Sequence, residues 1–309
     1  MGLEALVHIR KAIGTLNPQQ VRDLSERQLR IALHARSQEG YQRMEQFFLQ
    51  DLSPARRSQS ATQLVRAPIP PGAPVDLDVY DYDVVAPPNG LILSVAHGHE
   101  FVRHALARQS ELGVAMARSF VPFRRPFIDR VVARVARENT LFSVTTALPD
   151  VIPSVIELPW AVAEFASDTA FLTMNQVRMA FLIAAGSDRE VGYRHQKSEI
   201  ATVIGSAFGW RALARQLVGK IPLGGGLIAK AAVSYAGTKV LGLSLERYYR
   251  IGFTFTRHER DHMYWDAFRQ GKRVALKFLS SVRPELAKRF EKELQEHDRT
   301  ITAVSTHVS

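Results

Sequence analysis

Cysteine is absent from this sequence of 309 residues. Its absence excludes disulfide bonds, cysteine nucleophiles and thiolate metal sites, and it is compatible with a reducing compartment. The chain also lacks the Gly-x-x-x-x-Gly-Lys-Ser/Thr loop with which nucleotide hydrolases hold phosphates. Residues 1–14 contain Glu4 and lead into no long apolar run, so they predict no signal peptide. We therefore expect a location in, or facing, the cytoplasm.

Long hydrophobic runs are scarce as well. The most apolar window, residues 227–245, would form about 28 Å of helix. Its strongly apolar side chains favour membrane insertion by roughly 3.5 kcal/mol, but Lys239 lies well inside the window and costs about 3 kcal/mol. The two contributions nearly cancel. We therefore expect a helical bundle, or hairpins at the membrane interface, rather than helices that cross the bilayer.

The composition is otherwise that of a folded protein, with 46% hydrophobic and 23% charged residues. Lys and Arg number 40 against 30 for Asp and Glu, which gives a net charge of +10. Many bases stand beside acids, as in residues 291–293, and this pattern is typical of solvated helix faces. Binding to nucleic acid is therefore disfavoured, although the charge alone would permit it.

The N-terminal segment, residues 1–50, is predicted to be helical. Within it, residues 17–50 resemble a broken pair of helices, because Val21, Leu24 and Ile31 fall on one helical face and Gly40 provides a break.

Residues 51–90 hold seven of the fifteen prolines and are predicted to form a Pro-rich linker. Near residues 75–85, alternating Asp and apolar residues predict at most one short acidic strand. Its four aspartates suggest calcium, but no Gly or Glu of a calcium loop accompanies them. An acidic strand that lies against basic residues of the same protein is the favoured interpretation.

The helical core is predicted over residues 91–282, followed by a C-terminal helix and tail at 283–309. The fold class is therefore all-α, a multi-helix bundle. Charge is segregated in its middle part, because residues 149–177 contain acids without bases and residues 200–245 contain bases without acids. We expect the bases of the second stretch to face lipid headgroups or an acidic partner: Arg211, Arg215, Lys220, Lys230 and Lys239. We expect the acidic block 150–168 to pack alongside the helices that carry these bases. Small residues at four-residue intervals predict close helix packing: Ser234, Thr238 and Gly242.

Several stretches of this part are similar to a known family. They are MNQVRM (174–179), GWRALARQLV (209–218), KIP (220–222), AAVSYAGT (231–238) and RYY (247–249). Together they resemble the bacterial domain-of-unknown-function family 697 over residues 150–250. The resemblance implies a helical, membrane-associated module that is often linked to small GTPases, and it implies no catalytic residue. Because this chain lacks a phosphate-binding loop, the resemblance suggests a separate GTPase partner.

One motif points to an enzyme instead. His258 and His262 stand one helical turn apart with Glu259 between them, as in the His-Glu-x-x-His pattern of zinc hydrolases. On a helix both histidines could bind zinc while Glu259 activates water. The charged spacer, Arg260 and Asp261, and the lack of a clear third ligand argue against this interpretation.

The sequence therefore predicts a non-enzymatic, membrane-associated helical scaffold or adaptor without a cofactor. Its expected place is the cytoplasmic face of the inner membrane, peripheral or embedded in the interface. Expected partners are an anionic membrane surface, a protein such as a GTPase, and further copies of the chain. The alternatives are a zinc-dependent hydrolase that uses His258, Glu259 and His262, and a purely soluble helical interaction protein.

Overall fold

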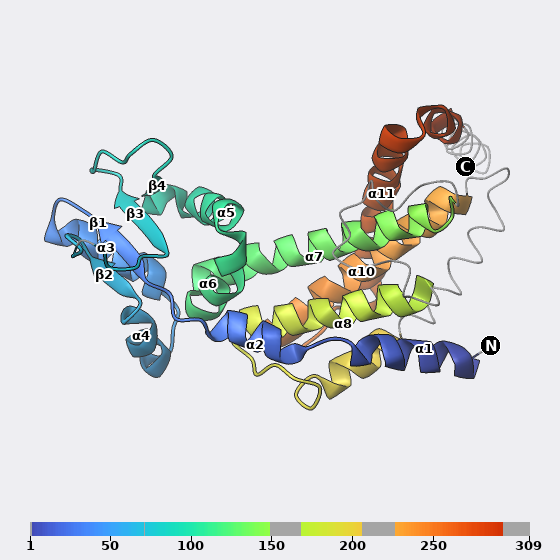
Figure 1. Cartoon of the computed structure of the whole chain (residues 1–309), viewed down its shortest axis with the longest axis horizontal. Helices are drawn as coiled ribbons and strands as arrows, with labels where there is room; N and C mark the ends of the chain where they lie inside the picture. Colours follow the sequence, from blue (N-terminus) through green and yellow to red (C-terminus); the bar gives the residue numbers. More distant parts are fainter. Residues whose placement is uncertain (1, 71, 149–167, 206–225, 293–309) are drawn as a thin grey trace. The chain divides into compact units, whose positions relative to one another are not determined.

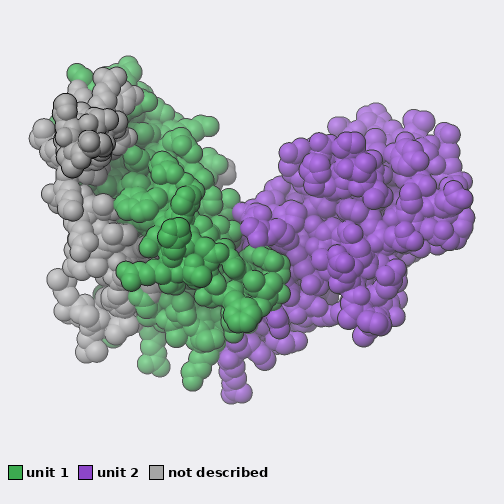
Figure 2. Space-filling model, turned by 180° about the vertical axis from the view of Figure 1, so that it is seen from behind, with its two compact units in different colours: residues 1–16, 132–180, 196–309 green, residues 17–131, 181–195 purple. Residues whose placement is uncertain are grey.

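The computed structural model describes residues 2–70, 72–148, 168–205 and 226–292 of the chain. They form two compact units, shown in different colours in Figure 2. Unit 1 comprises residues 1–16, 132–180 and 196–309, and unit 2 comprises residues 17–131 and 181–195.

Unit 2 combines a small sheet with short helices (Figure 1). Its elements are α2 (Pro18–Glu26), β1 (Ile31–His34), α3 (Gln38–Leu49), α4 (Pro54–Ala61), β2 (Leu64–Arg66), β3 (Leu77–Asp81), β4 (Leu91–Leu93), α5 (Gly98–Arg108), α6 (Gly113–Ser119) and the beginning of α7 (Val121–Thr145), with single 3-10 turns at Val95–His97 and Ser110–Leu112. The end of α8 (Asp168–Gly186) also belongs to it.

The sheet is parallel throughout, in the order β2-β1-β3-β4. Strand β1 has a neighbour on each side, and its first residue, Ile31, pairs with Leu64 of β2 and Leu77 of β3. The expectation of at most one strand is therefore wrong, and Ile31 belongs to a strand rather than to a helical face. Strands β1 and β2 have only four and three residues and show no alternation of buried and exposed positions, so periodicity cannot tell them from short helical segments.

The segment predicted as a linker is folded. Residues 51–90 contain α4, β2 and β3, and Pro54 begins α4, a position that proline tolerates well. The linker prediction is therefore wrong for these elements.

The acidic strand is confirmed as β3, and its aspartates do meet basic side chains of the same protein. Asp76, just before it, pairs with Arg27, and Asp78 lies 2.8 Å from His34 Nε2.

Aromatic side chains form the core of unit 2. Phe47 and Phe48 of α3 contact Phe101 of α5 edge to face, and Phe48 also contacts Phe120 and Phe123 with ring centroids 5.1 and 6.0 Å apart. Edge-to-face contacts add to the free energy gained by burying the rings. This cluster fixes α3 and α5 relative to the beginning of α7.

Unit 1 is helical in its described part, which confirms the mainly helical fold (Figure 1). It contains α1 (Gly2–Gly14), most of α7 and α8, a helix at 197–205, α10 (Gly226–Ile251), α11 (Arg257–Val282) and a helix at 284–292. Among the described helices, none is long and apolar enough to cross a membrane.

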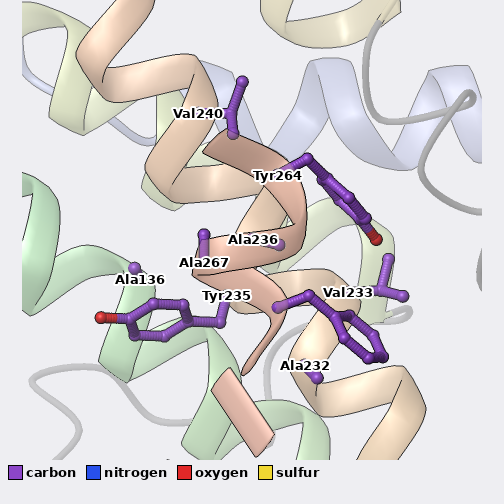
Figure 3. Packing of buried hydrophobic residues seen from close by; sticks show 9 residues of the cluster. Ala136, Ala232, Val233, Tyr235, Ala236, Val240, Tyr264 and Ala267 are labelled. Carbon is purple, nitrogen blue, oxygen red and sulfur yellow. The ribbon is translucent and has the colours of Figure 1, made fainter. Parts of the chain in front are cut away.

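Helices α10 and α11 pack closely against each other. Tyr264 and Ala267 of α11 belong to one buried cluster with Ala236 and Val240 of α10 (Figure 3). Gly271 allows the backbones to approach, because a Cβ there would lie 2.9 Å from Ala232 Cα. On the side of α11 that faces away from this cluster, Arg269, Arg273 and Lys277 are exposed.

Candidate functional site

The bases predicted to face lipid do not form one described surface. Arg211, Arg215 and Lys220, like the acids of residues 150–164, lie outside the described residues. Lys230 is half-buried in α10. Lys239 donates a hydrogen bond of 2.5 Å to Gln270 of α11, so its ammonium group faces the neighbouring helix.

The three small residues of α10 lie against α7 and α8. Ser234 donates to the backbone oxygen of Asn139 at 3.2 Å, and a Cβ on Gly242 would lie 2.5 Å from Val132 of α7. Thr238 is fully buried between these two positions. The spacing therefore marks a contact between helices of unit 1.

Thr238 is also the centre of a buried polar network. Its hydroxyl oxygen accepts hydrogen bonds of 3.0 Å from the side-chain amides of Asn139 and Gln176. Asn175 in turn donates to Asn139 Oδ1 at 2.9 Å. Hydrogen bonds between buried side chains fix the relative register of the helices that supply them, here α7, α8 and α10, although within the described residues the amide oxygens of Asn175 and Gln176 accept none.

The His-Glu-x-x-His pattern lies at the start of α11, where Glu259 caps the helix. Thr256 and Glu259 form a capping box, and Glu259 Oε1 accepts a hydrogen bond of 3.0 Å from Arg247. The Thr256 backbone N–H and hydroxyl, together with Arg247, lower the pKa of Glu259. Among the described residues no group of three potential metal ligands comes together. The geometry therefore gives the zinc alternative no support.

The outer face of α11 exposes a basic surface that the sequence analysis missed. Trp265, Arg269, Arg273 and Lys277 are exposed at four-residue intervals, which places them along one ridge of the helix. Residues 267–282 contain four bases and no acid, although Arg269 pairs with Asp266 just before them. The four-residue spacing is visible in the sequence and could have revealed this surface, which we call the basic face of α11.

Apolar side chains are exposed next to the start of α11. Ile251 is the last residue of α10 and Phe253 lies in the short connection to α11, with 44% and 73% of their surfaces exposed. Tyr248, one turn before the end of α10, is also exposed. Arg250 and Arg257 flank the connection and are also exposed. We call these residues the α10–α11 tip.

The carboxyl ends of β1 and β3 are the other place where a ligand would be expected. Neighbouring strands lie on both sides of β1, and parallel sheets of this kind bind ligands where the connections diverge. Here Arg43 of α3 donates to Asp81 at 2.7 Å, and Gly40 lies so near that a Cβ would be 2.8 Å from the same oxygen. Burial raises the pKa of Asp81, and Arg43 opposes that rise. Because this ion pair occupies the position, we assign no ligand to it.

No family model, curated protein or solved structure matches this chain. The resemblance to family 697 therefore stays a prediction.

Proposed function

We propose that the protein is a non-enzymatic adaptor that binds an anionic membrane surface through α11 and the α10–α11 tip. The main support is the basic face of α11, where Arg269, Arg273 and Lys277 are exposed beside Trp265. Tryptophan prefers the level of the lipid headgroups, and each base near an anionic surface contributes about 1 kcal/mol. We propose the cytoplasmic face of the inner membrane as its place of action, as expected from the sequence.

The apolar residues of the α10–α11 tip favour lipid over nucleic acid as the partner. Lys and Arg bind the phosphates of nucleic acids, whereas an exposed isoleucine makes no hydrogen bond or ion pair with phosphate. Ile251 and Phe253 would instead enter the interface between headgroups and acyl chains, as the apolar faces of amphipathic helices do. Attraction by the bases and insertion by the apolar side chains then act together.

Co-sedimentation with vesicles tests this proposal. We expect the full chain to sediment with phosphatidylcholine vesicles that contain about one third phosphatidylserine, and to stay in solution with phosphatidylcholine alone. Equal sedimentation with both kinds of vesicle would contradict the proposal.

A pair of variants tests the contribution of the tip. Phe253→Ser should weaken vesicle binding by about tenfold, because roughly 1.5 kcal/mol of apolar burial is lost. Val85→Ser is the matched control, since Val85 is an exposed apolar residue of unit 2 and should leave binding unchanged.

The adaptor role requires a protein partner as well. A separate small GTPase is the partner that the resemblance to family 697 suggests, and self-association is the other proposal. Co-purification with and without non-hydrolysable GTP distinguishes the two, because only a GTPase partner would respond to the nucleotide.

A further inference from the structure

Unit 2 contains a cavity of about 410 Å³ between the end of α2, α4 and the end of α6. We call it the α4 cavity. All eleven residues that line it are serine, glutamine, arginine or glutamate, and the charged ones are Glu26, Arg27, Arg56, Arg118 and Glu190. Most ligand sites of this size are lined mainly by apolar side chains. A lining without apolar side chains suits a small hydrophilic molecule.

One wall of the α4 cavity has an excess of positive charge. Arg56 donates a hydrogen bond to the carboxylate of Asp188, and the same carboxylate lies 3.7 Å from Arg118 and 3.8 Å from Arg124. Three guanidinium groups thus share the carboxylate of Asp188, and Glu26 lies 4.0 Å from Arg118, which leaves 3 − 2 = 1 positive charge. Burial lowers the pKa of Arg124, Asp188 opposes this, and the charges of Arg56, Arg118 and Arg189 lower it further.

The two arginines of this wall that line the cavity are held in place. Arg118 is only 11% exposed, and it donates to the backbone oxygen of Arg189 at 2.9 Å. Arg56 donates to Gln59 at 2.8 Å in addition to Asp188. Guanidinium groups fixed in advance bind an anion without a large loss of side-chain entropy.

Acceptors complete the lining. Glu26 and Glu190 contribute carboxylates, and Glu26 lies 4.0 Å from Arg118. The Gln63 side chain is buried, and its amide nitrogen donates to Ser119 at 3.2 Å. Within the described part of the chain its Oε1 accepts no hydrogen bond. Hydroxyl groups on a ligand would supply donors to the carboxylates of Glu26 and Glu190.

We propose that the α4 cavity binds a small hydroxylated phosphate monoester. Its phosphate group carries about two negative charges at neutral pH and accepts charge-assisted hydrogen bonds from guanidinium groups. Arg56 and Arg118 bind the phosphate oxygens, and the hydroxyl groups donate to Glu26 and Glu190. The site is independent of the membrane-binding surface, because all its residues belong to unit 2.

Calorimetric titration of the full chain tests the proposal with glycerol 3-phosphate, inorganic phosphate and glycerol as probes. We expect glycerol 3-phosphate to bind most tightly, inorganic phosphate more weakly, and glycerol not at all. Arg56→Gln should weaken binding of glycerol 3-phosphate at least about tenfold, because charge-assisted hydrogen bonds are lost.

Arg66→Gln is the matched control. Arg66 also forms an ion pair in unit 2, with Glu45, and its side chain is 40% exposed against 37% for Arg56. Arg56→Lys keeps the charge and should bind with intermediate affinity. Absence of binding to the wild-type chain at millimolar concentrations, or an equal loss in Arg56→Gln and Arg66→Gln, would overturn the proposal. Neither result affects the membrane proposal.

Discussion

Single polar atoms decide how the helices of unit 1 fit together. The hydroxyl oxygen of Thr238 accepts from two amides that belong to different helices, Asn139 on α7 and Gln176 on α8. Both amides are buried, so neither has water as an alternative partner. A residue chosen from the sequence only for its small size therefore acts as a shared acceptor.

Thr238→Val should lower the free energy of unfolding by about 2–4 kcal/mol. Valine has the shape of threonine but leaves both amide donors without this acceptor. Thr202→Val is the control, because Thr202 is exposed and should change stability by less than about 0.5 kcal/mol. Urea unfolding of the three proteins measures the difference, and equal stability of the two variants would refute the role of Thr238.

Glu259 stabilises the start of α11 by an amount that depends on pH. Its folded-state pKa is lowered from an ordinary value of 4.5 by hydrogen bonds from Thr256 and Arg247. The stabilisation is therefore fully present above pH 4.5 and is lost as the pH falls through the lower folded-state value.

Glu259→Gln should consequently unfold more easily than the wild type at neutral pH, and this gap should close as the solution is acidified below the ordinary pKa of glutamate. Denaturant unfolding at a series of pH values measures the gap. A gap that persists unchanged into acid would show that the carboxylate charge is not what stabilises the start of α11.

At the scale of elements, the long helices and strand β3 were predictable, and the other strands of the sheet were not. Helix α11 has a capping box that can be read from Thr256 and Glu259, and α10 follows from its apolar and small residues. Strand β2 has three residues, two of them apolar, and its strand character depends on pairing with β1 rather than on its own pattern. Pairing between distant segments is not visible in local periodicity.

The candidate site was predictable only in part for the same reason. Ser234, Thr238 and Gly242 were identified by spacing, and the structure shows which helices they contact. Lys239 of α10 points toward Gln270 because α11 packs at that position. The sequence of α10 alone does not indicate where α11 packs.

Gly271 tests the packing of α10 against α11. A Cβ at this position would lie 2.8 Å from Tyr235 Cβ and 3.0 Å from the backbone oxygen of Ala232, so the two helices would have to separate. Gly271→Ala should therefore destabilise the protein by about 1–3 kcal/mol in thermal or urea unfolding. Gly14→Ala is the control, because no atom lies within 4 Å of its Cβ position, and it should be neutral or slightly stabilising. Wild-type stability of Gly271→Ala would contradict the close approach.

At the scale of the whole molecule, the net charge of +10 attracts any polyanion. A weak, salt-sensitive association with anionic vesicles or with DNA therefore does not by itself identify a binding surface. The membrane proposal requires more, namely that the position of the bases matters and not only their number.

Two variants with the same net charge separate these explanations. Replacing Arg269, Arg273 and Lys277 by glutamine gives 10 − 3 = +7 and removes the basic face of α11. At about 1 kcal/mol for each base, binding to phosphatidylserine vesicles should fall by roughly a hundredfold.

The matched control replaces three exposed arginines of unit 2, Arg36, Arg57 and Arg103, by glutamine and also gives +7. It should retain most of its vesicle binding, whereas weak binding to double-stranded DNA should fall by the same amount in both variants, since it follows total charge. An equal loss of vesicle binding in the two variants would mean that the chain meets membranes through its overall charge. A loss of DNA binding confined to the α11 variant would instead make the basic face of α11 a nucleic-acid surface.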